Sequence, residues 1–123
     1  MENRVLVVDD NEFMLTMMRF ILDSEGYEVE TLTHAVGLME SINSYQPNLI
    51  ILDVQLPDGD GRDLCRQIKE THETRNIAVV MCSGLDDIND CYDQQGPPDG
   101  ILQKPFDMRQ LITLMEEKLP LAA

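Results

Sequence analysis

The chain has 123 residues, and nine Lys and Arg against 23 Asp and Glu give it a formal charge of −14 at pH 7. A chain of this length is expected to form one domain over residues 1–123, with no room for a second. So negative a charge repels phosphate backbones and anionic lipids, which excludes direct binding of nucleic acid or of a membrane and favours cations and basic partners. The 43 % hydrophobic fraction is that of a globular domain, not of a disordered segment.

The cysteine content and the N-terminus predict a soluble, cytoplasmic protein. The three cysteines, Cys65, Cys82 and Cys91, are odd in number and form no C-x-x-C pair, which argues against a disulfide framework and against a zinc site. The N-terminus lacks the charged-then-apolar pattern of a signal peptide, and no apolar run approaches the roughly 20 residues that span a bilayer.

Short apolar runs alternate with amphipathic stretches along the chain, which is typical of βαβ units that build a parallel sheet. The runs 5–8 and 49–52 are continuously aliphatic, and an aspartate follows each. They therefore predict central strands that helices cover on both faces. The segment 27–31 alternates polar with apolar residues and predicts a strand nearer the edge. The full set of predicted strands is 5–8, 27–31, 49–52, 78–82 and 100–103.

Apolar residues at helical spacing fill the stretches between these strands. A first helix is expected over residues 12–25, with Gly26 after its end. Its apolar positions are Phe13, Met14, Met17, Met18, Ile21 and Leu22. Two short helices are expected around residues 38–42 and 64–68, and Asp107 is expected to cap a C-terminal helix whose apolar stripe runs from Met108 to Leu119. A further helix is expected between residues 86 and 95, although little of that stretch is apolar.

Five such β/α units predict a doubly wound α/β domain, in which five helices flank a five-stranded parallel sheet of order 2-1-3-4-5. In open parallel sheets, ligands bind beyond the carboxyl ends of the strands, where the strand order reverses. Strands one and three are neighbours there, so Asp9, Asp10 and Asp53 are expected to share one crevice. Three carboxylates so close together require a cation, and oxygen ligands of this kind favour Mg²⁺.

Two further residues are expected at the same edge of the sheet. Ser83 follows the fourth strand and Lys104 follows the fifth. Phosphoryl transfer to an aspartate needs a nucleophile, a neutralising cation and donors for the phosphoryl oxygens. This set supplies them: one carboxylate as the nucleophile, further acids that hold a metal, and a hydroxyl and a lysine as donors.

Four motifs in order along the chain carry a resemblance to a known family. They are Asp9-Asp10, the run DVQLPDGDG from Asp53 to Gly61, Ser83-Gly84 and Lys104-Pro105-Phe106. Together they resemble the receiver domain of bacterial two-component response regulators, a CheY-like fold, over residues 4–119. Each motif alone is weak, but four at the ends of four successive predicted strands are specific.

The resemblance implies a role for each matching position at the metal site. Asp53 matches the aspartate that accepts a phosphoryl group. Asp10 and Asp53 match direct Mg²⁺ ligands together with the backbone carbonyl of Gln55, and Asp9 matches an acid that acts largely through water.

It also implies how the phosphoryl group is held. Lys104 matches the lysine that pairs with the phosphoryl oxygens, Ser83 matches the hydroxyl that moves to bind them, and Gly84 matches the small residue that follows it. The Lys104-Pro105 bond is expected to be cis, a geometry that is accessible before proline. Pro57 and Gly61 are expected to shape the loop after Asp53.

As a whole, the resemblance implies a signalling switch rather than an enzyme that acts on a separate substrate. Its phosphoryl donor would be a sensor histidine kinase or a histidine phosphotransfer protein, and the chain would be a monomer or a phosphorylation-dependent homodimer. These residues are expected to contain no output domain, either because the protein is a single-domain regulator or because the sequence is a fragment of a longer protein. The downstream target is not encoded in these motifs.

The sequence departs from the family around the expected fourth helix. Ile101 stands where family members commonly carry an aromatic residue that changes rotamer on activation. We expect Ile101 to pack in the core, with Tyr92 as the alternative site of an aromatic switch. Pro97-Pro98 lies where the family favours small residues, so this helix is expected to end early.

Two rival functions share part of this pattern: the first would also use Mg²⁺, Asp and Lys, and the second has the same fold topology. An aspartate-nucleophile phosphatase would need a D-x-D pair on the first strand, and a flavodoxin-like FMN protein would need a phosphate loop rich in Ser, Thr and Gly after that strand. The chain instead has Asp9-Asp10-Asn11-Glu12 there, and these acids repel a bound phosphate.

Overall fold

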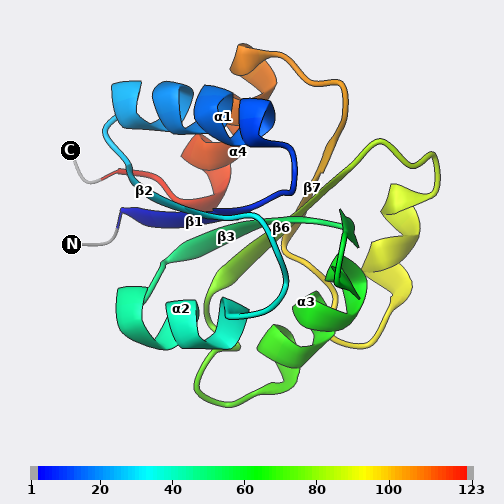
Figure 1. Ribbon diagram of the computed structural model, residues 1–123. Helices are drawn as coiled ribbons and strands as arrows, with labels where there is room; N and C mark the ends of the chain where they lie inside the picture. The colour runs from blue at the N-terminus through cyan, green and yellow to red at the C-terminus, as the bar shows by residue number, and fades with distance from the viewer. Residues whose placement is uncertain (1–2, 122–123) are drawn as a thin grey trace.

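The computed structural model describes residues 3–121 and has the predicted α/β architecture. Five parallel strands form a sheet in the order β2-β1-β3-β6-β7, which is the predicted order 2-1-3-4-5 (Figure 1). The strands are β1 (Arg4–Val8), β2 (Glu28–Leu32), β3 (Leu49–Asp53), β6 (Ala78–Ser83) and β7 (Gly100–Gln103). Two very short strands, β4 (Gln55–Leu56) and β5 (Gly59–Asp60), form a separate hairpin at the turn expected after Asp53.

Helices cover both faces of the sheet. On one face lie α1 (Glu12–Ser24) and α4 (Met108–Lys118), and on the other lie α2 (Leu38–Tyr45) and α3 (Gly61–Glu70) (Figure 1). Each strand therefore supplies side chains to two cores: Val5 and Val7 belong to the core under α1 and α4, and Leu6 and Val8 to the core under α2 and α3. Burial on both faces is the reason the central strands are continuously apolar.

Two apolar residues of the predicted stripes face solvent instead of the core. Phe13 is 78 % exposed and Met108 is 58 % exposed, so both core predictions are wrong. The buried face of α1 is Leu15, Met18, Ile21 and Leu22, and at 100° per residue Phe13 lies on the opposite side of the helix. Met108 is the first residue of α4 and precedes the turn that reaches the sheet.

The predicted fourth helix is a 3₁₀-helix, η1 (Ile88–Asp93), rather than an α-helix. Its short length follows from the residues after it. Gly96 has a left-handed φ of 63°, and a Cβ there would lie 2.8 Å from the Cα of Arg66. Pro97 and Pro98 follow and disfavour helical backbone before them. The helix must therefore end before Gly96, which agrees with the early end predicted from Pro97-Pro98.

Helix ends follow the sequence signals. Gly26, after α1, has a φ of 99°, a conformation that glycine adopts without strain. Asn11 accepts a hydrogen bond from the Met14 amide at the start of α1. Asp107 and Gln110 form a reciprocal capping box at the start of α4. These caps satisfy amide groups that have no partner within the helix.

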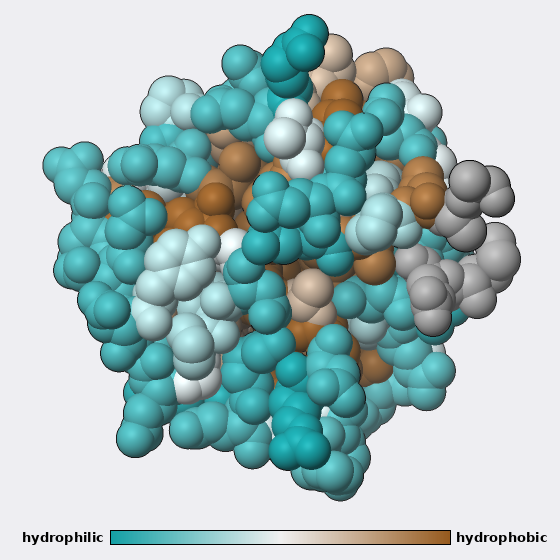
Figure 2. Space-filling view, turned by 180° about the vertical axis from the view of Figure 1, so that it is seen from behind, coloured by the Kyte–Doolittle hydropathy of each residue, from teal (hydrophilic) through white to brown (hydrophobic). Residues whose placement is uncertain are grey.

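The outer surface is mainly hydrophilic, as the net charge requires. Figure 2 shows teal residues over most of one face, with hydrophobic side chains recessed between them. The three cysteines are free and buried. Within residues 3–121, no helix has both the length and the apolar character needed to cross a bilayer.

The capping box at α4 provides a test of the fold. Asp107→Ala removes the acceptor for the Gln110 amide, so the free energy of unfolding is expected to fall by about 1 kcal/mol. Asp107→Asn keeps an acceptor and is expected to keep most of the stability. Urea unfolding followed by circular dichroism measures both, with the exposed Arg109→Ala as a control. Equal stability of Asp107→Ala and the parent would contradict the assignment.

Candidate functional site

The candidate site is a cleft at the carboxyl ends of the strands. Asp9 directly follows β1, Asp53 is the last residue of β3, and Lys104 directly follows β7. The β1–β3 register pairs Val8 with Leu52 and so brings Asp9 beside Asp53. Together with Asp10, Gln55 and Gly84, these residues line an open cavity of about 510 Å³. The strand ends thus bring together the acids and the lysine as predicted from their positions in the sequence.

The three aspartates form a compact acidic cluster. One carboxylate oxygen from each of Asp9, Asp10 and Asp53 lies within 4.8 Å of the others. Asp9 is 2 % exposed and Asp53 is 6 % exposed, whereas Asp10 is open to solvent. Buried like charges at this distance repel one another unless a cation lies between them. The cluster could therefore hold a metal ion.

Lys104 supplies a positive charge to this cluster. Its Nζ donates to Asp9 Oδ2 at 2.8 Å and to Asp53 Oδ2 at 3.4 Å, so one ammonium bridges both buried carboxylates. Removing one member of a buried ion pair leaves an uncompensated charge, which is costly. Lys104 therefore stabilises both acids where they are.

The remaining oxygen of each buried acid accepts a backbone amide. Asp9 Oδ1 accepts from the Asn11 amide at 2.9 Å, and Asp53 Oδ1 accepts from the Gln55 amide at 3.2 Å. Each bond spans two residues along the chain, so the loop after each strand fixes the carboxylate that ends it.

The environment shifts the pKa of two of these groups. Burial is the main cause that raises the pKa of Asp53, and the nearby Asp9 charge adds to it, while Lys104 and the Gln55 amide oppose it. For Lys104, burial alone would lower the pKa, but the hydrogen bond to Asp9 and the negative charges of Asp53 and Asp9 outweigh it and raise the pKa. The ammonium is therefore held in its charged form.

Ser83 lies beside the cleft but does not line it. Its side chain is buried, and its Oγ accepts from the Leu85 amide at 3.0 Å. Its backbone carbonyl accepts from the Lys104 amide at 2.8 Å, which joins the ends of β6 and β7. Within the described residues 3–121, the Ser83 hydroxyl accepts a hydrogen bond but donates none. That hydrogen is available to a new acceptor in the cleft if the loop after β6 moves.

Gly61 is required by the close approach of two chain segments. A Cβ at position 61 would lie 2.1 Å from the backbone oxygen of Asp53. The Gly61 amide also donates to Val54 O at 2.7 Å, so α3 begins against the end of β3. Pro57 lines the cleft, and the Lys104-Pro105 peptide bond is cis.

Sequence reasoning missed two contributors. Asn11 both lines the cleft and caps α1, and an Asn before an apolar periodic stretch is a signal for a cap that could have found it. Asp58 accepts from the amides of Ala35 and Val36 at 2.6 and 2.9 Å, which ties the loop after β3 to the loop after β2. No local pattern signals that contact, because its partners are more than 20 residues away in the chain.

The structure also shows where Ile101 and Tyr92, the alternative site of an aromatic switch, lie. Ile101 is half-buried and packs against the core under α2 and α3, in keeping with the expected packing role. Tyr92 is 48 % exposed on η1.

The raised pKa of Asp53 gives a pH-dependent prediction. A carboxyl whose folded pKa lies above its unfolded value of 3.8 lowers stability when ionised. Asp53→Asn is therefore expected to raise the free energy of unfolding at pH 7 in metal-free buffer, because Lys104 keeps its shorter bond to Asp9 and is not left unpaired. The gain shrinks as pH falls through the folded pKa and vanishes below the unfolded value. Urea titrations across this pH range measure it.

The matched control is Asp23→Asn, which removes the same charge from an exposed position of α1. It is expected to leave stability nearly unchanged at every pH. Equal gains in the two variants would show that global charge, and not the environment of Asp53, is responsible.

Comparison with known proteins agrees with this geometry. The chain is 31 % identical to the receiver domain of NtrX from Brucella abortus, with a TM-score of 0.83 and coverage of 96 % of this chain and 99 % of that one. It is 29 % identical to a CheY-like response regulator receiver domain protein from Methanospirillum hungatei, with a TM-score of 0.87 and coverage of 97 % and 94 %. It is 27 % identical to the signal receiver domain of a signal transduction histidine kinase from Syntrophus aciditrophicus, with a TM-score of 0.85 and coverage of 95 % and 89 %.

A sequence model of the response regulator receiver domain matches residues 5–116, which is most of the chain and includes the four motifs at the strand ends. The fold, the strand order and the acidic cleft agree with that match. The chain therefore belongs to the response regulator receiver domain family of two-component signalling.

Proposed function

We propose that the chain accepts a phosphoryl group on the Asp53 carboxylate from a phosphohistidine on a sensor histidine kinase or a histidine phosphotransfer protein. The observation that carries the proposal is the placement of Asp53. It is a nearly buried carboxylate within reach of an ammonium and two further acids, at the floor of a cleft open to solvent.

The transfer needs a nucleophile, an open approach and neutralisation of charge. An Asp53 oxygen forms a bond to phosphorus while the bond from phosphorus to the donor imidazole nitrogen breaks. The imidazole keeps the electron pair and takes a proton from solvent. The chain catalyses its own phosphorylation and dephosphorylation and acts on no separate substrate.

The acidic cluster fits Mg²⁺, because its donors are hard carboxylate oxygens and one acid, Asp10, remains open to solvent. Asp10 and Asp53 would hold the ion directly with the Gln55 backbone carbonyl, and Asp9 would act through water. When bound, Mg²⁺ supplies the positive charge that lets a phosphoryl group approach three carboxylates.

Lys104 and Ser83 would hold the transferred group. The Lys104 ammonium already contacts Asp53 Oδ2, so it lies beside the carboxylate that gains the phosphoryl oxygens. The Ser83 hydroxyl can donate to one of those oxygens if its loop moves toward the cleft, and Gly84 leaves that side of the cleft without a side chain. A phosphoryl group adds about 1.5 to 2 negative charges, which attract both donors.

The moving segment would extend into η1. The Leu85 amide binds Ser83 Oγ, and η1 starts three residues later. A 3₁₀-helix has poorer hydrogen-bond geometry than an α-helix, so this segment is well suited to change on phosphorylation. The contact that it presents to a target, or to a second copy of the chain, would carry the signal onward.

The donor protein would dock beside the cleft, on the solvent face of α1. Phe13 and Phe20 are 78 % and 72 % exposed, and they lie on one face with the half-buried Met17. Phe13 is two residues from Asn11, which lines the cleft. Aromatic residues, phenylalanine among them, and methionine are enriched in protein interfaces relative to the rest of the surface.

Phosphorylation can be tested with a small phosphodonor and Mg²⁺, followed by intact mass spectrometry. The parent protein is expected to gain one phosphoryl group, and Asp53→Asn is expected to gain none. Asp63→Asn, at an exposed position of α3, is the matched control and is expected to be labelled like the parent. EDTA is expected to abolish labelling, since Mg²⁺ is needed. An unlabelled parent, or a labelled Asp53→Asn, would overturn the proposal.

Docking can be separated from chemistry by comparing donors. Phe13→Ser is expected to slow transfer from a phosphohistidine protein about tenfold, the loss typical of an interface anchor. It is expected to leave labelling by a small phosphodonor unchanged. Val36→Ser, at another exposed apolar residue, is the control and is expected to change neither rate. Equal slowing with both donors would place the effect of Phe13 in the cleft instead of at an interface.

A further inference from the structure

We infer that a second cavity, between the carboxyl ends of α1 and α4, binds a small organic cation: an amine or guanidine joined to an apolar body. The cavity has a volume of about 320 Å³, which lies at the lower end of the range for ligand pockets. It lies toward the amino ends of the strands, where Tyr27 precedes β2, at the opposite end of the sheet from Asp53. It is therefore separate from the acidic cleft.

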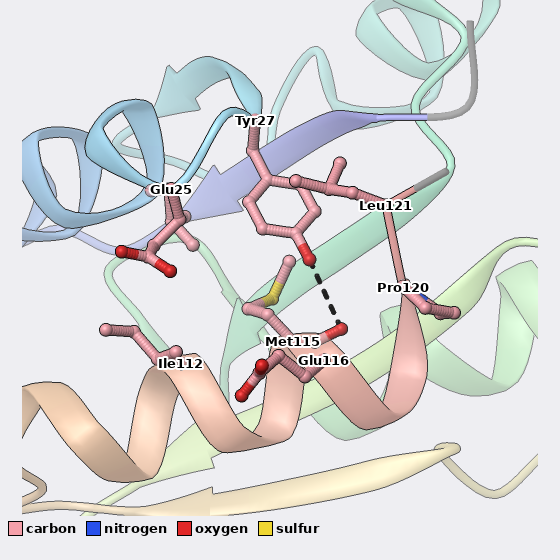
Figure 3. A pocket seen from close by; sticks show the side chains of 8 residues that line it. Glu25, Tyr27, Ile112, Met115, Glu116, Pro120 and Leu121 are labelled. Carbon is pink, nitrogen blue, oxygen red and sulfur yellow. Dashed lines mark hydrogen bonds between the residues drawn. The ribbon is translucent and has the colours of Figure 1, made fainter. Parts of the chain in front are cut away.

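The walls of this cavity are apolar. Leu22 from α1 and Met115 from α4 line it and are fully buried, and Ile112 and Leu121 lie on either side of Met115 (Figure 3). Tyr27 also lines the cavity, and its ring points from the start of β2 toward α4. Such a lining favours an alkyl or aryl group, because burial of apolar surface is favourable and polar groups would find few partners there.

The charges at the cavity are negative. Glu25 and Glu116 both line it, and Figure 3 shows their carboxylates on its two sides, one at the end of α1 and one on α4. Among the described residues 3–121, no lysine, arginine or histidine lines it. Within residues 3–121, neither glutamate has an ion-pair partner in the salt-bridge geometry. Lys118, the basic residue in the last turn of α4, pairs instead with Glu117 at 3.2 Å.

Two helix ends add to this negative potential. Both α1 and α4 end at the cavity, and the carboxyl end of a helix carries a partial negative charge. Burial raises the pKa of the Tyr27 hydroxyl, and the charges of Glu116 and Glu25 raise it further. Both carboxylates therefore act on the same point inside the cavity, and both would attract a cation there.

Tyr27 gives the site a further feature that suits a cation. Its hydroxyl donates to the Leu119 backbone oxygen at 2.6 Å and lies 3.4 Å from the Met115 oxygen. With its hydrogen committed, the phenolic oxygen can only accept, and an ammonium or guanidinium is a donor without acceptor capacity. The aromatic face next to it can also attract a cation.

Size and charge together define the ligand class. At roughly 30 Å³ for each water-sized group, the cavity has room for about ten such groups. A single aromatic or branched alkyl group that carries one ammonium or guanidinium meets this limit. An anion would be repelled by both glutamates, and a neutral molecule would leave them paired only with water, because both side chains are exposed.

Phenethylamine is a suitable probe, with phenethyl alcohol as its neutral match and hydrocinnamate as its anionic match. Two-dimensional amide NMR of the whole chain follows each titration in the presence of Mg²⁺, which occupies competing carboxylates in the acidic cleft. The amine is expected to bind saturably and to shift the amide resonances of Glu25, Tyr27 and Glu116. The alcohol is expected to bind about fivefold to tenfold more weakly, and the anion not at all.

The double variant Glu25→Gln/Glu116→Gln is expected to bind the amine as weakly as the alcohol and to bind the alcohol as the parent does. Glu117→Gln is the matched control, because it removes the neighbouring carboxylate that pairs with Lys118, and it is expected to bind the amine normally. The inference is overturned if the amine causes no saturable shift at millimolar concentration, if the three probes bind equally, or if the double variant keeps full affinity. None of these outcomes depends on phosphorylation at Asp53.

Discussion

The ammonium of Lys104 between the buried carboxylates of Asp9 and Asp53 is the interaction on which the site depends. Without it, two anions would lie side by side away from water, which is among the least favourable arrangements in a protein interior. With it, the three aspartates and one lysine leave two negative charges at the edge of the sheet. One divalent cation would neutralise these two charges, so the charge balance of the site suits the Mg²⁺ that we propose there.

The strand order places these groups together. Because β1 and β3 are neighbours at the centre of the sheet, two acids that are far apart in the sequence end at adjacent points. Lys104 comes from the edge strand β7, and its long side chain crosses the end of β6 to reach them. The same edge carries the starts of α1 and α3, each with a side-chain cap from Asn11 or Asp60. The fold thus fixes the carboxylates at their backbone and leaves the cleft above them open.

Much of this could be predicted from the sequence because the central strands are buried on both faces. A continuous apolar run as short as 49–52 has the length of a buried strand rather than of a helix, and the acid that follows it marks the end of the sheet where ligands bind. Helix faces were less certain, because spacing alone does not tell which side of α1 meets the sheet, and Phe13 proved to face solvent. The Asp58 contact could not be predicted, since it depends on how two distant loops meet in space. The acidic cluster was predictable, and the way Ser83 lies beside the cleft was not.

The contact between Gly61 and the backbone oxygen of Asp53 has a consequence for how this chain can vary. Any side chain at position 61 would overlap that oxygen. A substitution there therefore requires the backbone of the hairpin between Asp53 and Gly61 to change its conformation. That hairpin also holds the amide that fixes the Asp53 carboxylate. Folding and the chemistry that we propose therefore depend on the same backbone contact, and this glycine can be exchanged only together with the loop that holds the Asp53 carboxylate.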